Sequence, residues 1–266
     1  MTNSDKDSVM DDKVVTVQNP TDMAGVSSGY RGKVVIGQDK ISEIDFESLD
    51  KTCPTHSFGF DKKSQALSVD HGKCISCDKC RALSPELIKI KSNFAPASKN
   101  RTGLVESFDI GDISRSYDEI GEELKEKIHN LYGRSLAIRE VDAGSCNGCE
   151  VEITALNNPI YDIARFGIHF VASPRHADLL LVTGPASRNM EIALKRTYDA
   201  TPNPKLVVAV GACACSGGIF GDTYATTGGI DKIVPVDVYI PGCPPRPQAL
   251  IYGILLAINK KLDSKI

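Results

Sequence analysis

The chain has 266 residues, of which 41% are hydrophobic and 24% charged, and its net charge is −3. These values are typical of a soluble globular protein with one large domain or two smaller ones, and nothing in them points to nucleic-acid binding. No signal-peptide pattern opens the chain, and the longest apolar stretch near the C-terminus, Ala249–Ile258, has about half of the roughly 20 residues that a membrane helix needs. We therefore expect a cytoplasmic protein that reaches a membrane only through partners.

Nine cysteines are the most informative feature of the composition. An odd number excludes a complete set of intramolecular disulfides, and an intracellular chain keeps its thiols reduced. The cysteines are clustered along the sequence, at positions 53, 74, 77, 80, 146, 149, 213, 215 and 243. Such clustering predicts metal sites.

The first third of the chain divides into a polar lead and a compact unit. Residues 1–30 contain five Asp against two Lys and few large apolar residues, so we predict a flexible segment. Residues 31–90 contain two expected strands, 31–36 and 66–69, the second following the turn residues Asp61–Ser64. Short strands and several cysteines in so small a unit predict an α+β domain built around a cofactor.

Residues 91–135 are predicted to be a connector, which is polar and irregular over 93–103. Four apolar residues then recur at helical spacing, with Glu and Lys between them: Ile120, Leu124, Ile128 and Leu131. This pattern predicts an amphipathic helix that packs on the following domain.

Residues 136–266 alternate between strand and helix patterns. The expected strands are 136–141, 168–172, 179–183, 206–210 and 236–240, and the expected helices are 151–164 (broken near Pro159), 188–199 and 246–260. This order predicts a doubly wound parallel sheet, in which functional groups gather at the carboxyl ends of the strands. Three cysteine groups follow strands here: Cys146 with Cys149, Cys213 with Cys215, and Cys243.

Four of these cysteines form the pattern C-x2-C-x63-C-x29-C-P: Cys146, Cys149, Cys213 and Cys243. Four thiolates at one sheet edge fit either a 4Fe–4S cluster or a structural zinc ion. Only one pair is close in sequence, which favours the larger iron–sulfur cluster. A thioredoxin-like dithiol would explain Cys146 and Cys149, but it leaves the other two without a role.

The N-terminal cysteines follow the core of a bacterial ferredoxin motif, C-x2-C-x2-C: Cys74, Cys77 and Cys80. Ser84 stands where the fourth cysteine of the motif belongs. Cys53-Pro54 resembles the end of a second such motif, whose own three cysteines are replaced by Glu43, Phe46 and Leu49. We therefore predict a ferredoxin-like domain that has kept one of two clusters, with Cys53 as fourth ligand and zinc as the alternative metal. A hairpin over Phe58–Gly72 would return the chain to Cys53.

Several motifs of the second half together resemble one family: Gly144–Glu150 (GSCNGCE), Ser173–Asp178 (SPRHAD), Gly211–Cys213 (GAC), Ser216–Phe220 (SGGIF) and Pro241–Pro245 (PGCPP). They look like the small, proximal-cluster subunit of group 4 membrane-bound NiFe hydrogenases, most of all the formate hydrogenlyase type. That subunit is homologous to the proximal-cluster subunit of respiratory complex I. Complex I subunits have adjacent cysteines at the first position, so the spacing Cys146-x2-Cys149 favours the hydrogenase branch.

The resemblance implies a flavodoxin-like fold and a proximal 4Fe–4S cluster on the four C-terminal cysteines. It also implies a large partner subunit that carries the Ni–Fe centre, a ferredoxin-type electron donor, and membrane subunits that hold the complex at the cytoplasmic side. The expected function is electron transfer through two clusters to or from the Ni–Fe site, so the chain is an oxidoreductase subunit that is not catalytic alone. The alternative is a complex I-like subunit whose proximal cluster reduces a quinone or another acceptor.

A few residues beside the C-terminal cysteines are further candidates. Glu150, which matches the family's glutamate, either relays protons at the partner interface or is only a charge stabilised at a helix N-terminus. Arg175 and His176 are candidates for a hydrogen bond to the cluster, although a lone histidine is more often structural. Cys215 is predicted to be a buried structural thiol. The glycine pairs at 217–218 and 228–229 lack the order of a phosphate loop, so we expect tight turns.

Overall fold

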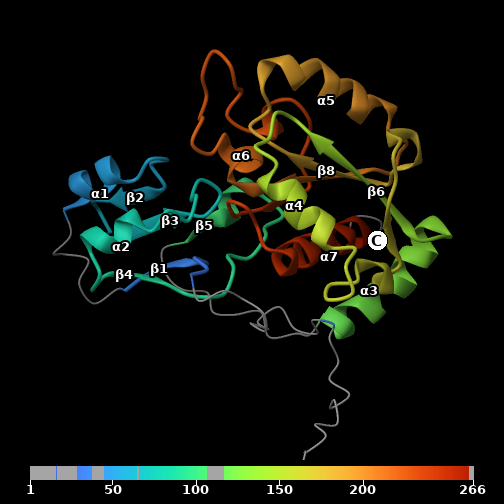
Figure 1. The fold of residues 1–266 in the computed structure, drawn as a ribbon, viewed down its shortest axis with the longest axis horizontal. Coiled ribbons are helices and arrows are strands. Elements are labelled where there is room, and N and C mark those ends of the chain that lie inside the picture. The colour runs from blue at the N-terminus through green and yellow to red at the C-terminus, as the bar shows by residue number, and fades with distance from the viewer. Residues whose placement is uncertain (1–15, 17–28, 38–44, 65, 107–116, 264–266) are drawn as a thin grey trace, which may run out of the picture.

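The computed structural model describes residues 16, 29–37, 45–64, 66–106 and 117–263. They form a smaller N-terminal part with antiparallel sheets and a larger C-terminal α/β domain (Figure 1). Most of the predicted polar lead, residues 1–30, lies outside the described residues. No helix within the described part of the chain is both long and apolar enough to cross a membrane.

The C-terminal domain contains a sheet of five parallel strands: β6 (Leu136–Asp142), β7 (Ile168–Phe170), β8 (Leu179–Thr183), β9 (Leu206–Val210) and β10 (Val238–Ile240). Their order across the sheet is β7-β6-β8-β9-β10. Numbered within the domain, this is the order 2-1-3-4-5 of flavodoxin-like folds, so the predicted fold class is confirmed. Because all the strands are parallel, their carboxyl ends lie at one edge of the sheet.

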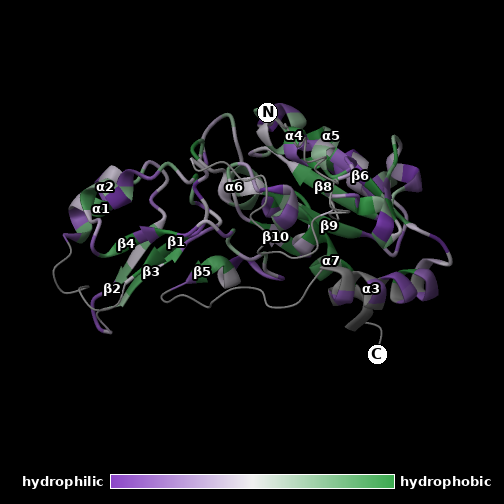
Figure 2. Cartoon of the chain, turned by 60° about the horizontal axis from the view of Figure 1, so that its bottom comes forward, coloured by the Kyte–Doolittle hydropathy of each residue, from purple (hydrophilic) through white to green (hydrophobic). Residues whose placement is uncertain are grey.

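Helices cover both faces of this sheet. One face packs against α7 (Pro247–Asp263) and α3 (Tyr117–Tyr132), and the other against α5 (Arg188–Ala200) and the short α6 (Gly211–Ser216). Alternate strand residues enter the two cores, which explains why β9 is apolar along its whole length and β8 is apolar up to its last residue, Thr183 (Figure 2). The two strands were predicted with the bounds that the structure has.

The helical predictions differ in how well they hold. The amphipathic helix is confirmed as α3, whose Ile128 is buried in the same core as α7, while the side chains of Ile120, Leu124 and Leu131 lie outside the described residues. Helical structure is predicted over 151–164 with a break near Pro159, and the structure has such a break. Helix α4 spans Gly148–Ala155, and a separate 3-10 turn follows at Ile163–Phe166. The Asn158 side chain accepts hydrogen bonds from the backbone N–H groups of the next turn, which ends the helical pattern.

The N-terminal part combines short strands with two short helices. Strands β1 (Val34–Ile36) and β4 (Ile88–Ile90) form one antiparallel pair, and β2 (Phe58–Asp61), β3 (Ala66–Asp70) and β5 (Val105–Glu106) form a second sheet, with helices α1 (Phe46–Thr52) and α2 (Lys79–Leu83) beside them. Strands β2 and β3 form the predicted hairpin. The small core includes Leu49, Leu67 and Ile88 together with Cys53 and Cys80.

The segment predicted to be a connector is built into both parts of the chain. Strand β5 pairs with β3 of the N-terminal sheet. Seven residues earlier, Ser98 exchanges two backbone hydrogen bonds with Tyr239 of β10, of 3.0 and 2.8 Å. These contacts hold the N-terminal part against the β10 side of the parallel sheet.

Candidate metal centres

The four C-terminal cysteines all lie in loops or helix starts that follow parallel strands. Cys146 and Cys149 come after β6, Cys213 lies in α6 directly after β9, and Cys243 follows β10. The Cys149 sulfur lies 3.9 Å from the carbonyl oxygen of Val210, the last residue of β9. The sheet therefore brings cysteines from three separate segments to its carboxyl edge, as the strand order predicts.

Two glycines make room for the sulfur atoms at this edge. Gly211 has a φ of +85°, and a Cβ there would lie 2.8 Å from the Cys149 sulfur. Gly218 has a φ of +54°, and a Cβ there would lie 2.9 Å from the Cys213 sulfur. Glycine adopts such angles without strain and has no side chain to displace the thiols. The predicted tight turn at Gly217 and Gly218 is thus part of the packing around the cysteines.

The C-terminal thiols interact electrostatically with one another. Burial raises the pKa of the Cys149 thiol, and Glu150 and the other three cysteines raise it further. Burial also raises the pKa of Cys213 to about 11, with further contributions from Cys243 and Cys146. Four ionised thiols this close repel one another unless a metal centre neutralises them. This set of donors therefore fits the four-cysteine coordination of an iron–sulfur cluster.

The N-terminal site brings together the four cysteines that the sequence predicts. Cys74 and Cys77 lie in the loop before α2, Cys80 lies in α2, and Cys53 follows the last residue of α1. Burial raises the pKa of Cys74 to about 12, and the neighbouring thiols of Cys80, Cys53 and Cys77 add to the increase. The hairpin of β2 and β3 brings the chain back from Cys53 to the Cys74 loop. Ser84, the rival fourth ligand, ends α2 and donates its backbone N–H to the Cys80 carbonyl.

Backbone N–H groups point at two sulfur atoms of this site. The N–H of Ser57 donates to the Cys53 sulfur at 3.3 Å, and the N–H of Ser76 donates to the Cys74 sulfur at 3.4 Å. Hydrogen bonds to the cysteine sulfurs are one of the features that set the potential of an iron–sulfur cluster. No sequence pattern marks these donors, because they depend on backbone conformation.

The two C-x2-C loops that begin helices share one backbone conformation. Asp78, after Cys77, and Asn147, after Cys146, both have φ 68° and ψ 3°. Each begins a helix whose first turn carries the next cysteine. Asp and Asn are the non-glycine residues that best tolerate this left-handed conformation, so their position inside each C-x2-C is a sequence signal that our prediction missed.

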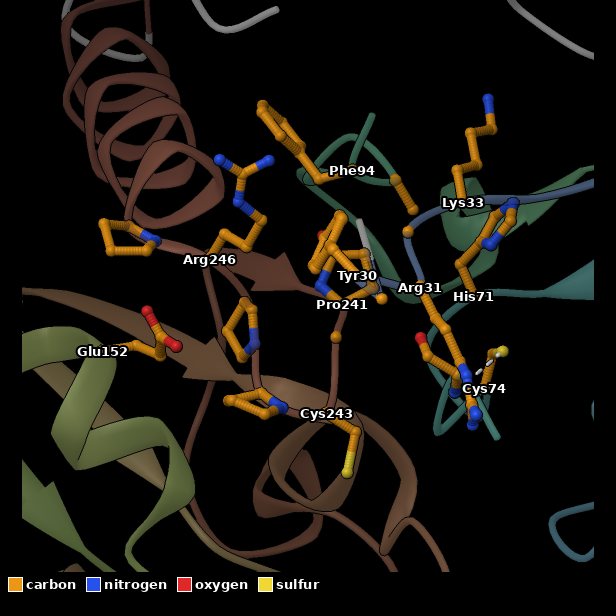
Figure 3. A pocket seen from close by; sticks show the side chains of 18 of the residues that line it. Tyr30, Arg31, Lys33, His71, Cys74, Phe94, Glu152, Pro241, Cys243 and Arg246 are labelled. Carbon is orange, nitrogen blue, oxygen red and sulfur yellow. Dashed lines mark hydrogen bonds between the residues drawn. The ribbon is translucent and has the colours of Figure 1, made fainter. Parts of the chain in front are cut away.

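A cavity of about 610 Å³ lies between the two cysteine sites (Figure 3). Cys74 lines it from the N-terminal part and Cys243 from the C-terminal domain. The Arg246 guanidinium lies 4.7 Å from the centre of the Tyr30 ring across the junction, and Arg31 donates to the Cys77 carbonyl at 3.0 Å. In the described residues, no three His, Cys, Asp or Glu side chains converge on a single metal-ion position.

The C-terminal domain matches the family model described as NADH ubiquinone oxidoreductase, 20 kDa subunit, over residues 146–257. The chain is also 50% identical over 128 residues to a probable membrane-bound hydrogenase subunit of Pyrococcus furiosus, a match that covers 48% of this chain and 77% of that protein. The chain belongs to this family of oxidoreductase subunits. The family model begins at Cys146, so the N-terminal cysteines lie outside it.

Other matches come from both branches of the predicted resemblance, which they confirm. Formate hydrogenlyase subunit 7 of Escherichia coli is 48% identical over 154 residues, covering 58% of this chain and 60% of that protein. An NADH-quinone oxidoreductase subunit of Citrifermentans bemidjiense is 52% identical over 118 residues, covering 44% and 66%. Among solved structures, a chain of the archaeal membrane-bound sulfane sulfur reductase aligns with a TM-score of 0.42 and 37% identity, covering 52% of this chain and 73% of that one.

The ninth cysteine lies away from both sites. Cys215 is buried, and its sulfur lies 3.9 Å from the Ala209 carbonyl oxygen and 3.7 Å from that of Ile240. It therefore packs against β9 and β10 in the core under α6. The predicted burial of this thiol is confirmed, and its structural role stays a prediction.

Glu150, the family's glutamate, points toward the sheet. One of its carboxylate oxygens accepts a hydrogen bond from the Thr183 hydroxyl at the end of β8, and the other is buried with no hydrogen-bond partner among the described residues. Burial raises the pKa of Glu140 on β6, and the charge of Glu150 raises it further. Glu150 also lies in the first turn of α4, so both predicted roles remain predictions.

Arg175 and His176 lie away from the carboxyl edge of the sheet. They form a 3-10 turn, Pro174–His176, that ends three residues before β8 begins, and both side chains are exposed. Asp178, two residues after the turn, accepts a hydrogen bond from the backbone N–H of Ala137, at the start of β6. The turn thus lies near the amino ends of β6 and β8, and the structure does not bring these two side chains to the cysteines.

Proposed function

We propose that this chain is an electron-transfer subunit of a membrane-associated complex of the NiFe hydrogenase type, with a 4Fe–4S cluster at each of its two cysteine sites. The observation that supports this most strongly is the division of the nine cysteines: two sets of four, and one thiol buried elsewhere. When bound, the clusters would supply one-electron transfer. The ligands would be Cys53, Cys74, Cys77 and Cys80 at one site and Cys146, Cys149, Cys213 and Cys243 at the other.

The residues around each site hold the thiols and limit their access to water. At the N-terminal site, Cys53 and Cys80 are buried among apolar side chains, and Ser57 and Ser76 donate backbone N–H groups to sulfur. At the C-terminal site, Gly211 and Gly218 let the chain approach the sulfurs closely. These features suit a rigid site that changes charge by one unit with little rearrangement.

The surface around the C-terminal site supports a partner at this edge. Cys146 and Cys243 are exposed, and so are apolar side chains that follow the cysteines closely in sequence: Val151 (61% exposed), Ile219 (57%) and Phe220 (50%). Large exposed apolar side chains near a functional site mark interaction surfaces. We propose that a large subunit carrying the Ni–Fe centre covers this surface, that membrane subunits anchor the complex at the cytoplasmic side, and that a ferredoxin-type donor approaches the N-terminal site.

A complex I-like subunit is the second candidate, because the NADH-quinone oxidoreductase subunit of Citrifermentans bemidjiense is 52% identical over 118 residues. In that case the C-terminal cluster would reduce a quinone or another acceptor. The C-x2-C spacing of Cys146 and Cys149 favours the hydrogenase branch. The partner decides between the two: a co-purified large subunit with two C-x2-C pairs implies nickel, and one without them implies another acceptor.

Metal analysis of the full chain, purified without oxygen, tests the two-cluster assignment. We expect about eight iron and eight sulfide per chain, a brown colour and broad absorption at about 400 nm, because two four-iron clusters are bound. Zinc in place of iron would contradict it. About four iron per chain would leave one site without a cluster and contradict the two-cluster relay.

A further inference from the structure

The loops that carry the two cysteine sites are in direct contact. The hydroxyl of Ser216, the last residue of α6, lies 2.9 Å from the carbonyl oxygen of Gly72. Ser216 is three residues after Cys213, and Gly72 is two residues before Cys74. The same hydroxyl accepts the N–H of Gly218 at 3.3 Å. The carbonyl oxygen of Ala212 lies 3.0 Å from the same hydroxyl, so the one hydroxyl hydrogen is shared between Gly72 and its own helix. The Ser216–Gly72 contact joins residues within three positions of a cysteine from each site.

Arg101 joins the same two loops by three further hydrogen bonds. Its Nε donates to the carbonyl oxygen of Cys215 at 2.9 Å, and its two terminal nitrogens donate to the two carboxylate oxygens of Asp70 at 2.8 Å each. Asp70 in turn accepts the N–H of Gly72 on its side chain at 2.9 Å and the N–H of Cys74 on its backbone carbonyl at 3.1 Å. One guanidinium thus connects the Cys74 loop to α6.

This bridge is largely shielded from solvent. The side chains of Arg101 and Asp70 are 23% and 16% exposed, and bidentate arginine–carboxylate pairs of this kind are stronger than ordinary surface ion pairs. A Cβ on Gly72 would lie 2.8 Å from the Arg101 Nη1 atom, so a glycine is what lets the guanidinium lie on the loop. The N–H of His71 also donates to the Leu104 carbonyl at 2.9 Å, which holds the loop against the segment that carries Arg101.

We propose that Arg101 and Ser216 are positioning residues that fix the separation of the two clusters for electron transfer between them. The proposal rests on the proposed function, because it requires both clusters. The step moves one electron: the donating centre is oxidised by one unit, the accepting centre is reduced by one unit, and no bond or proton changes. Because electron tunnelling slows steeply with distance, a bridge between the loops controls its rate without touching either metal centre.

The test compares four variants of the full chain with the wild type. Arg101→Met removes the guanidinium but keeps a side chain of similar length. Arg101→Lys keeps the positive charge but loses the two parallel hydrogen bonds to Asp70, and Ser216→Ala removes the hydroxyl. Arg196→Met changes an exposed arginine on α5 and serves as the matched control. Iron content, the magnetic interaction between the two reduced clusters by electron paramagnetic resonance, and hydrogen exchange of the apo-chain over residues 70–74 are measured for each.

We expect all variants to keep the wild-type iron content. Arg101→Met should weaken the magnetic interaction between the clusters and speed exchange over residues 70–74 by about tenfold or more, because hydrogen bonds to a charged group are lost. Arg101→Lys and Ser216→Ala should change both readouts in the same direction but less, and Arg196→Met should change neither.

Three outcomes overturn the proposal. If Arg101→Met leaves both the magnetic interaction and the exchange at their wild-type values while iron content is unchanged, the bridge does not position the sites. If Arg101→Met loses iron, the proposal is tested on Arg101→Lys and Ser216→Ala instead. Wild-type values of the magnetic interaction and of the hydrogen exchange in both of these variants would reject it. If the wild type itself holds fewer than two clusters, the proposed function fails first, and iron content identifies that case.

Discussion

At the scale of single residues, the assignment of Cys53 as the fourth N-terminal ligand rests on both the sequence and the structure. In the sequence, Cys53 and Ser84 are rivals for the fourth ligand position. Two features favour Cys53: thiolate sulfur is a softer ligand than a hydroxyl, and Cys53-Pro54 matches the end of a ferredoxin motif. The structure adds two physical reasons for Cys53. It is buried in one core with Cys80, and it contributes to the raised pKa of Cys74.

Cys53→Ala should therefore remove one cluster. We expect the iron content to fall from about eight to about four per chain, because the N-terminal site is left with three thiolates. Ser84→Ala and Cys215→Ala are the matched controls and should keep about eight iron. Full iron in Cys53→Ala, together with loss of iron in Ser84→Ala, would show that the serine is the ligand.

A second residue-scale prediction concerns the buried carboxylate of Glu106. Its Oε2 atom lies 2.8 Å from the Lys33 ammonium and 3.2 Å from the His71 ring, and all three side chains are at most 4% exposed. Burial alone would raise the pKa of Glu106, but the hydrogen bonds from His71 and Lys33 lower it below its usual value. The pKa of Glu106 is therefore lower in the folded chain than in the unfolded chain. The ionised carboxylate stabilises the folded chain fully at pH values above the unfolded pKa, and this stabilisation is lost as the pH falls through the folded pKa.

At pH 7 the whole contribution is present, so Glu106→Gln should destabilise the chain by about 3–5 kcal/mol, because the buried Lys33 ammonium loses the carboxylate charge beside it. The matched control is Glu47→Gln, whose partner Lys51 and own side chain are both more than 70% exposed, and it should cost less than about 1 kcal/mol. Denaturant unfolding at pH 7 measures both. Equal effects in the two variants would mean that the buried pair contributes nothing beyond a surface pair.

At the scale of elements, the strands buried on both faces could be predicted with their bounds, whereas the two-residue strand β5 could not be predicted. The strands 179–183 and 206–210 are apolar except for Thr183 because helices cover both sides of the sheet, so the sequence shows their bounds directly. Strand β5 has two residues, and its pairing with β3 joins segments about 35 residues apart, so no local pattern marks it. Helices α1 and α2 were missed because they are short and are packed around the cysteines.

The end of β9 gives a prediction at this scale. Gly211→Ala should disturb the C-terminal site, because its Cβ would lie 2.8 Å from the Cys149 sulfur. Gly133→Ala is the matched control: it also has a positive φ, of +67°, but a Cβ there meets nothing within 4 Å. Both variants carry similar backbone strain, and we expect only Gly211→Ala to fall to about four iron per chain. Equal iron content in the two would show that strain, not the sulfur, matters at Gly211.

At the scale of the whole molecule, the strand order explains why ligands far apart in sequence meet. Parallel strands place the loops after β6, β9 and β10 at one edge, so this convergence was predictable from the alternation of strands and helices. The placement of the N-terminal part against the parallel sheet could not be predicted from the sequence. It depends on Ser98 pairing with Tyr239 and on Arg101 bridging two loops, and these are tertiary contacts of polar residues that no periodicity reveals.

The exposed apolar side chains beside the C-terminal site lead to the last prediction. Phe220, 50% exposed, follows Cys213 by seven residues, whereas Ile192, 64% exposed, lies on α5. If a large subunit covers the cysteine edge, a charge at Phe220 must be buried in that interface, which costs several kcal/mol. Phe220→Glu should therefore lower the amount of large subunit that co-purifies with the chain by at least about tenfold, and Ile192→Glu should leave it unchanged. Iron content, expected to stay at the wild-type value in both variants, separates lost assembly from lost clusters. Normal assembly of Phe220→Glu, or equal losses in the two variants, would place the partner elsewhere.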